Sequence, residues 1–312
     1  MTRFGDFAPL CHDTPSYPWC NLFYRQIQRI NPSVLSGISS NPAQAPVGIN
    51  PECAIPFVGV DGSLANIANI IACGASLLVI VALIWFTSRR TAAVARSEFR
   101  IFLVLYLFTL IFQLLDTGSF LHQGSTPLTV LTAIHAGFVA ATFWALVGTA
   151  LVSTQIVEDG TLSSLIPFTF FSVAFFAAVT YISLDVAFGF TQTFGPSVPL
   201  QDLHSIPLFV LTNIWPGAAA LIYFALMLYI ILGILNEVKP VWYYILAAVL
   251  FVLSQLDFFL LSRVICRGAN ARIDGSFVAT VLETATVVVL FFGWKSITEE
   301  NWDEYDYYGG YR

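Results

Sequence analysis

Long apolar runs alternate with short polar loops between Leu64 and Trp294. Seven runs of 21 to 31 residues can be delimited, at 64-86, 99-121, 128-156, 162-190, 205-235, 241-264 and 274-294. A helix needs about 20 apolar residues to cross a hydrocarbon core about 30 Å thick, so each run can span a bilayer. Because lipid offers the backbone no hydrogen-bond partners, the pattern predicts an all-α membrane protein, a bundle of seven transmembrane helices.

Composition agrees with this interpretation, since 57% of the residues are hydrophobic and only 10% are charged. Charged residues make up about 25% of an average soluble domain. We therefore divide the chain into an N-terminal segment at 1-63, a seven-helix membrane domain at 64-294 and an acidic aromatic tail at 295-312. Eight prolines punctuate the first segment and make a long helix there improbable, so we expect an irregular cap held by disulfides. Pro216 should kink the fifth helix, and Pro240 should begin the sixth.

Basic residues near the membrane predict the orientation, because Lys and Arg favour the cytoplasmic side. The loops on the side of the N-terminus hold three of them, namely Arg263, Arg267 and Arg272. The opposite side holds six, namely Arg89, Arg90, Arg96, Arg100, Lys239 and Lys295. We expect a lumenal N-terminus and a cytosolic C-terminus, with the first helix as the insertion signal, since no cleavable signal peptide is recognisable.

Cysteine positions fit this orientation. Cys11, Cys20, Cys53 and Cys266 all fall on the lumenal side, and only Cys73 lies within a span. Four cysteines in an oxidising compartment suggest two disulfides, with three possible connectivities. Unpaired thiols are the alternative.

Ionisable residues within the spans are functional candidates, because burying them in a bilayer costs about 2.5 to 3.5 kcal/mol at the centre. They are Asp116, His135, Asp185, Asp257 and Glu283. The first three carboxylates lie toward the lumenal helix ends, where we expect caps or pairing with Arg263 rather than a proton relay. Glu283 lies midway through the seventh helix and should face the bundle.

Catalytic patterns are missing from the sequence. The four histidines show no HxxxH spacing that would suit a zinc hydrolase, and there is no GxSxG elbow or phosphate loop. The third helix lacks the Asp/Glu-Arg-Tyr triplet of receptors, and the seventh lacks their Asn-Pro-x-x-Tyr turn. We therefore expect no enzyme activity, no cofactor, no metal and no nucleic-acid partner.

The tail interleaves acidic and aromatic residues. Glu304 and Asp306 flank a tyrosine, a spacing that occurs in addresses bound by vesicle coat components. The alternative is a solvated terminus without such a role.

Several motifs in register resemble the fungal chitin synthase export chaperone family. They are Phe4-Gly5-Asp6-Phe7, Gly48-Ile49-Asn50-Pro51-Glu52-Cys53, Glu158-Asp159-Gly160-Thr161-Leu162-Ser163, Ile265-Cys266, Asp274-Gly275-Ser276-Phe277-Val278-Ala279-Thr280 and Trp294-Lys295-Ser296-Ile297-Thr298. The resemblance extends from Phe4 to Glu300. It departs at 21-50, which is longer and more basic, and at the end of the tail.

This resemblance implies a multi-pass protein of the endoplasmic reticulum membrane that helps a polytopic chitin synthase to fold and leave for the cell surface, without modifying it covalently. Such a protein supports cell-wall chitin synthesis and can travel with its client to the plasma membrane. Membrane lipids and the client are then its partners. We expect client helices to dock on the lipid-facing surfaces, where small-residue patches at 74-76 and 217-220 allow close approach. Internal packing of those patches is the alternative, and a seven-helix receptor or small-solute transporter is the alternative function.

Overall fold

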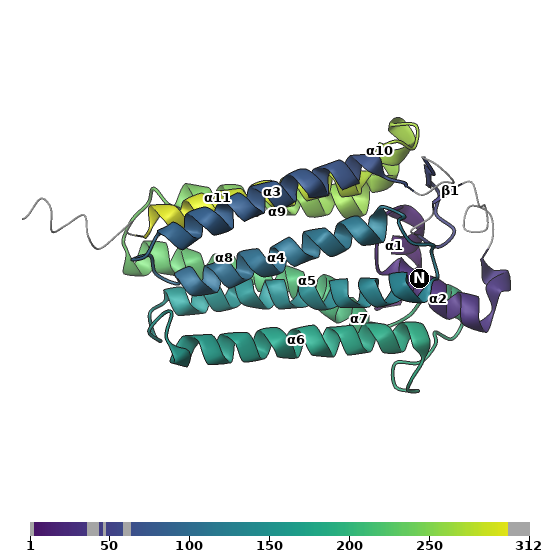
Figure 1. Ribbon diagram of the computed structural model, residues 1–312, viewed down its shortest axis with the longest axis horizontal. Helices are drawn as coiled ribbons and strands as arrows, with labels where there is room; N and C mark the ends of the chain where they lie inside the picture. Colours follow the sequence, from purple (N-terminus) through teal and green to yellow (C-terminus); the bar gives the residue numbers. More distant parts are fainter. Residues whose placement is uncertain (1–2, 36–43, 46–47, 59–63, 299–312) are drawn as a thin grey trace, which may run out of the picture.

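The computed structural model describes the chain except residues 1–2, 36–43, 46–47, 59–63 and 299–312 (Figure 1). Its seven membrane-length helical segments are α3 (Ile67–Arg89), α4 (Arg96–Thr117), α5 (Thr126–Ser153), α6 (Leu162–Phe188), Ile206–Ile234, Val241–Gly268 and α11 (Gly275–Ser296). Each overlaps one of the apolar runs, so the all-α membrane architecture is confirmed for the described residues.

Three of these helices are preceded by a polar residue whose side chain caps the first helical turn. Asn66 caps α3 by accepting from the backbone amide of Asn69, and Ser125 caps α5 by accepting from that of Leu128. Asp274 caps α11 in the same way. Such oxygens satisfy amides that have no partner in the first helical turn.

The fifth and sixth segments are interrupted by wider π-helical turns. The fifth consists of α7 (Ile206–Phe209), η5 (Val210–Ile214), α8 (Trp215–Tyr229) and η6 (Ile230–Ile234). The sixth consists of α9 (Val241–Leu256), η7 (Asp257–Leu261) and α10 (Ser262–Gly268). The turn η5 ends two residues before Pro216. Pro216 was expected to kink the fifth helix, because proline lacks the amide that a regular turn needs. Pro240 directly precedes α9, as expected.

The N-terminal segment lies at one end of the bundle, here called the cap end, while α11 finishes at the opposite or tail end (Figure 1). The cap contains α1 (Ala8–Asp13), α2 (Cys20–Ile30), η1 (Pro32–Val34) and a short antiparallel pair of β1 (Gln44–Ala45) and β2 (Ile55–Pro56). The loop before α7 contains η4 (Leu200–Asp202).

The prolines were expected to exclude a long helix from the N-terminal segment, but α2 forms there. Pro18 and Pro32 flank it rather than interrupt it, so its eleven residues form without a break. Leu22, Phe23 and Ile27 form one fully buried face, and α2 packs against α5 and α6.

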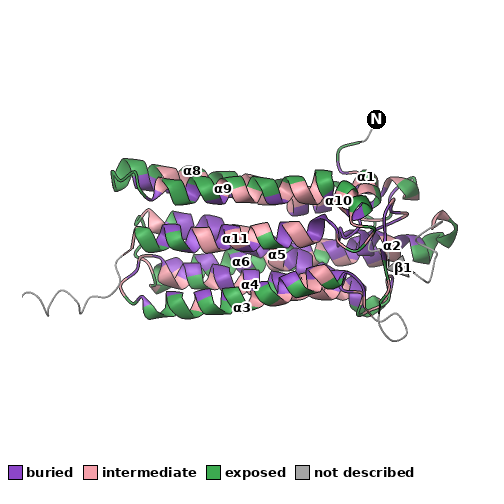
Figure 2. Cartoon of the chain, turned by 90° about the horizontal axis from the view of Figure 1, so that it is seen from above, coloured by how far each residue is buried: buried purple, intermediate pink, exposed green. Residues whose placement is uncertain are grey.

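Helix α5 occupies the centre of the bundle. Within the most apolar window of each span, 61% of α5 is buried inside the protein, compared with 17% of α6 and 17% of the sixth segment. Figure 2 shows the corresponding exposed positions along α9. Helices α6 and α9 therefore present most of their apolar side chains outward, toward the surrounding lipid or a membrane partner.

Candidate functional site

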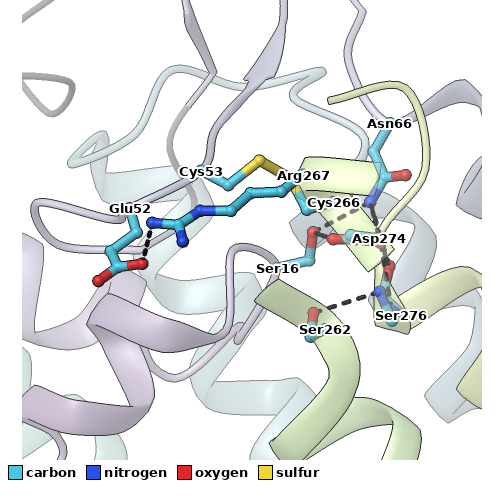
Figure 3. The surroundings of a disulfide bond; sticks show 10 residues. Ser16, Glu52, Cys53, Asn66, Ser262, Cys266, Arg267, Asp274 and Ser276 are labelled. Carbon is cyan, nitrogen blue, oxygen red and sulfur yellow. Dashed lines mark hydrogen bonds and ion pairs between the residues drawn. A yellow bond between two sulfur atoms is a disulfide. The ribbon is translucent and has the colours of Figure 1, made fainter. Parts of the chain in front are cut away.

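Two disulfides fasten the cap. Cys11 pairs with Cys20, nine residues away, and Cys53 pairs with Cys266, 213 residues away. Figure 3 shows the second bond, which joins the segment before α3 to α10. The remaining cysteine, Cys73, is buried in α3 without a disulfide. The long-range bond makes the cap part of the membrane domain rather than a separate appendage.

An ion-pair cluster lies beside this bond. The Arg267 guanidinium donates to the Glu52 carboxylate (Figure 3). One helical turn earlier, Arg263 Nη1 lies 3.4 Å from Glu52 Oε2 and 3.3 Å from Asp13 Oδ1. The expected pairing of Arg263 with carboxylates of the spans was therefore wrong, because α10 directs this arginine toward the cap.

The same cluster brings three potential metal ligands together. His12, Asp13 and Glu52 offer ligand atoms that all lie within 4.8 Å of one another. However, two arginines already neutralise Glu52, and the imidazole of His12 lies 3.1 Å from the Asp13 carboxylate. We interpret the group as an ion-pair network, which orients the cap on α10.

A buried polar network joins the cap to the starts of two spans. Asp274 Oδ1 accepts from the amide of Ser276 at 3.1 Å and from its hydroxyl at 2.5 Å. The Ser16 hydroxyl donates to the other carboxylate oxygen, and Asn66 Nδ2 donates to Ser16 Oγ at 3.0 Å (Figure 3). All four residues are almost completely buried. Paired in this way, the Asp274 carboxylate avoids the large cost of an isolated buried charge.

Gly275 is required by close packing at this point. A Cβ atom there would lie 2.5 Å from the carbonyl oxygen of Asp257 and 2.8 Å from Cα of Ser262. The amide of Gly275 also donates to Ser262 Oγ at 3.2 Å. The Asp-Gly pair thus allows α11 to begin directly against the junction of η7 and α10.

A second motif forms a structural turn at the tail end. Asp159 Oδ2 accepts from the amide of Ala95 at 3.0 Å, and this residue precedes α4. Gly160, with a positive φ of 67°, donates its amide to Glu98 Oε1 at 3.2 Å. Ser164 Oγ donates to the same oxygen at 2.8 Å. Glu98 is buried, and Glu158 is exposed. These contacts hold the loop between α5 and α6 against the start of α4.

Trp294 connects α11 to the same end of α4. Its ring stacks on Phe99 with centroids 5.1 Å apart and planes inclined by 14°. Its indole Nε1 donates to the carbonyl oxygen of Val94 at 2.9 Å. The tryptophan thus closes the tail end much as Asp274 and Cys266 close the cap end.

The structure gives different environments to the ionisable residues of the spans. His135 Nδ1 lies 2.9 Å from Asp116 Oδ2, and both side chains are buried. Asp185 accepts from the amide of Thr191 at 2.7 Å and from its hydroxyl, so its carboxylate holds the loop that follows α6. Asp257 begins η7 and places its backbone carbonyl against α11.

Glu283 faces the interior of the bundle. Gln255 Nε2 of α9 donates to Glu283 Oε1 at 3.1 Å. Both side chains line a cavity of about 190 Å³ between α4, α5, α8, α9 and α11. Tyr17 of the cap closes this cavity and donates its hydroxyl to Asn213 Oδ1 at 2.7 Å. Burial raises the pKa of Tyr17, so its hydroxyl remains a donor.

Several residues that contact these motifs were not predicted from the sequence. Ser16, Asn66 and Glu98 have only weak local signals, since Asn66 precedes an apolar run and Glu98 lies in a first helical turn. Their partners in these motifs lie 50 to 258 residues away, so spacing could not reveal them. The candidate sorting residues Glu304 and Asp306 lie outside the described residues.

These features define an all-α, seven-helix membrane protein whose N-terminal segment is bonded to one end of the bundle. Comparison with known proteins identifies the family. The model of the chitin synthase export chaperone family matches residues 3–305, and the chain belongs to this family.

Relatives that carry this name occur in diverse fungi. The chitin synthase export chaperone of Chaetomium globosum is 28% identical over 308 residues, which cover 96% of this chain and 83% of the relative. That of Neurospora crassa is 26% identical over 313 residues, with 96% and 78% covered. That of Candida glabrata is 23% identical over 298 residues, with 95% and 94% covered. No solved structure matches the chain.

Proposed function

We propose that this protein is a non-enzymatic chaperone of the endoplasmic reticulum membrane that helps a chitin synthase to fold and to leave that membrane. Membership of the export chaperone family over residues 3–305 is the observation that carries this proposal. The structural roles of its motif residues support it, because Glu52, Asp159, Gly160, Asp274 and Trp294 fasten helices and loops to one another. Nothing in these contacts calls for covalent chemistry.

The proposal includes a lumenal N-terminal cap at 1-63, a membrane domain at 64-294 and a cytosolic tail at 295-312. Two observations support this orientation. The four cysteines of the two disulfides all lie at the cap end, and disulfides persist in oxidising compartments. Arg89, Arg90, Arg96 and Arg100 lie at the tail end, as the preference of basic residues for the cytosol requires.

The client is proposed to dock on the outward faces of the bundle. An unassembled synthase exposes polar groups of its spans to lipid, where they lack partners. A helix of the chaperone can cover them where small residues let two backbones approach closely. Gly74 and Gly217 fit this requirement, since a Cβ atom at either position would meet nothing within 4 Å. Neither glycine is needed for packing within this chain.

Replacing Gly217 with leucine tests this docking surface. We expect recovery of the synthase in a detergent pull-down to fall severalfold, because the larger side chain holds the client helix away. Gly233→Leu is the matched control, since Gly233 lies on the same helical segment and is also exposed. Equal recovery with both variants would remove the Gly217 surface from the proposal.

Deletion of the protein tests the chaperone function itself against the receptor or transporter alternative. Loss of a chaperone should retain a chitin synthase inside the cell and reduce wall chitin. Normal traffic of every chitin synthase in the deletion strain would contradict the proposed function.

A further inference from the structure

The cavity inside the bundle is large enough to hold a ligand. Its volume of about 190 Å³ exceeds the 150 Å³ of an engineered protein cavity that binds benzene. Apolar side chains form most of its wall, among them Phe102, Phe143, Phe251 and Leu290. A few polar groups converge on this apolar space, which is the usual composition of a small-molecule site.

Glu283 supplies the first of these polar groups. Gln255 occupies Oε1, whereas Oε2 has no hydrogen-bond partner among the described residues. The Oε2 atom of Glu283 is also not fully buried, so it is accessible from the cavity. A carboxyl oxygen that is accessible inside an apolar site is an acceptor for a ligand's donor group.

His135 supplies the second group, from the cap end. Asp116 lies beside Nδ1, and the ring of Trp19 contacts the imidazole with centroids 5.0 Å apart and planes inclined by 56°. His135 is only 4% exposed, yet Nε2 has no partner in the described part of the chain and is not fully occluded. With the proton of the imidazole on Nδ1, toward the carboxylate, Nε2 presents a lone pair to the cavity.

We take the boundary between α8 and α9 as the route of entry from the membrane. Helix α8 packs mainly on α5, and α9 packs mainly on α11, while Tyr223 of α8 and Tyr244 of α9 lie with their ring centroids 6.3 Å apart. Asn213 and Gln255, which line the cavity from these two segments, are both partly exposed. We infer that a hydrocarbon chain reaches the cavity laterally along this boundary, without passing through the cap.

We propose that this cavity binds a single-chain membrane amphiphile whose polar end, a hydroxyl or an amine, donates hydrogen bonds. The polar end meets the acceptors Glu283 and His135, and the chain lies along the phenylalanines and extends through the gap beside α8. A carboxylate end would face the acidic side chain of Glu283 and is disfavoured. This inference concerns the interior and does not depend on which protein docks outside.

The test uses four photoreactive, clickable probes of equal chain length in membranes that contain the full-length protein. One probe ends in an amine, one in an alcohol, one in a carboxylic acid and one in a methyl group. We expect the amine and the alcohol to label peptides of the cavity severalfold more than the acid and the methyl-ended chain do. An excess of the corresponding unlabelled amine or alcohol should remove that labelling.

Three variants locate the site, and the comparison of the amine with the alcohol distinguishes the two sources of the donor. Val139→Trp should abolish labelling by filling the cavity, whereas Val173→Trp, on the outward face of α6, should leave it unchanged. Glu283→Gln should reduce labelling by the amine about tenfold and by the alcohol less, since hydrogen bonds to a charged group are roughly twice as strong. Dominant labelling by the alcohol identifies a neutral lipid, and dominant labelling by the amine identifies a cationic one.

Equal labelling by all four probes would overturn the proposal, as would labelling that persists in a folded Val139→Trp protein. If that variant does not fold, competition in the wild-type protein and the response of Glu283→Gln decide the question. Labelling that resists competition and ignores Glu283→Gln means non-specific partitioning. None of these labelling results tests the chaperone function, which is tested separately by the traffic of the synthase in the deletion strain.

Discussion

At the residue scale, capping side chains and one glycine without a side chain determine where the helices begin and how closely they pack there. Asn66 and Asp274 stand immediately before the first residues of α3 and α11, and both are residue types that favour helix N-caps. Their contact with Ser16 could not be predicted, because 50 and 258 residues separate that serine from its partners. Gly275 was visible as part of a motif, but only the packed structure shows why glycine is needed there.

The first residue-scale prediction concerns Gly275→Ala. The added methyl group would collide with the backbone carbonyl of Asp257, which cannot move without shifting η7. We expect a loss of about 1 to 3 kcal/mol in stability, the usual cost of overpacking. Thermal unfolding of the purified protein measures it as a lower midpoint. Gly268→Ala is the control, since a Cβ atom there meets nothing within 4 Å. Equal midpoints for the two variants would contradict the packing argument.

At the element scale, the loop between α5 and α6 could be predicted from the sequence only in part. Its Glu-Asp-Gly sequence predicts a turn, and the positive φ of Gly160 agrees with this. The attachment of the turn to Glu98 depends on α4 and α6 lying against α5, which local sequence does not specify. The position of α2 could not be predicted locally either, because its buried face packs against α5 and α6.

The second prediction, at this scale, is that Glu98→Ala loosens the turn. Two donors, the amide of Gly160 and the hydroxyl of Ser164, would lose their acceptor. Gly160 is exposed and Ser164 Oγ can still donate to the carbonyl oxygen of Thr161, so each lost hydrogen bond should cost about 0.5 to 1.5 kcal/mol. Hydrogen exchange should increase at residues 159–161, and the unfolding midpoint should fall. Glu158→Ala, at an exposed position in the same loop, should change neither quantity. Unchanged exchange in Glu98→Ala would show that the carboxylate does not hold the turn.

At the scale of the whole molecule, the cap is locked to the bundle by one covalent bond and several polar contacts. Cys53–Cys266 spans most of the chain, Arg267 and Arg263 engage Glu52, and Ser16 joins the starts of α3 and α11. A bundle joined at both ends in this way holds its helices in one arrangement, and the outward apolar faces keep their positions with them.

The third prediction, at this scale, is that removal of the long-range disulfide destabilises the protein more than removal of the local one. Disulfides contribute about 2 to 5 kcal/mol in small domains, and the chain-entropy model gives more for longer loops. Cys53→Ser with Cys266→Ser should therefore lower the unfolding midpoint further than Cys11→Ser with Cys20→Ser. Limited proteolysis should also cut the segment before α3 more readily in the first variant. The reverse order in both measurements would refute a locking role for the Cys53–Cys266 bond.

The sequence by itself determined the number of spans, because an apolar run of about 20 residues is a local property and the bilayer thickness sets the length required. It also determined which cysteines share one side, since seven crossings fix the side of each loop relative to the others. The tertiary structure decided how those cysteines pair, where Arg263 points and what surrounds Glu283 and His135. Each of these depends on residues far apart in the chain that meet only after the helices have packed, so no pattern of neighbouring residues could specify them.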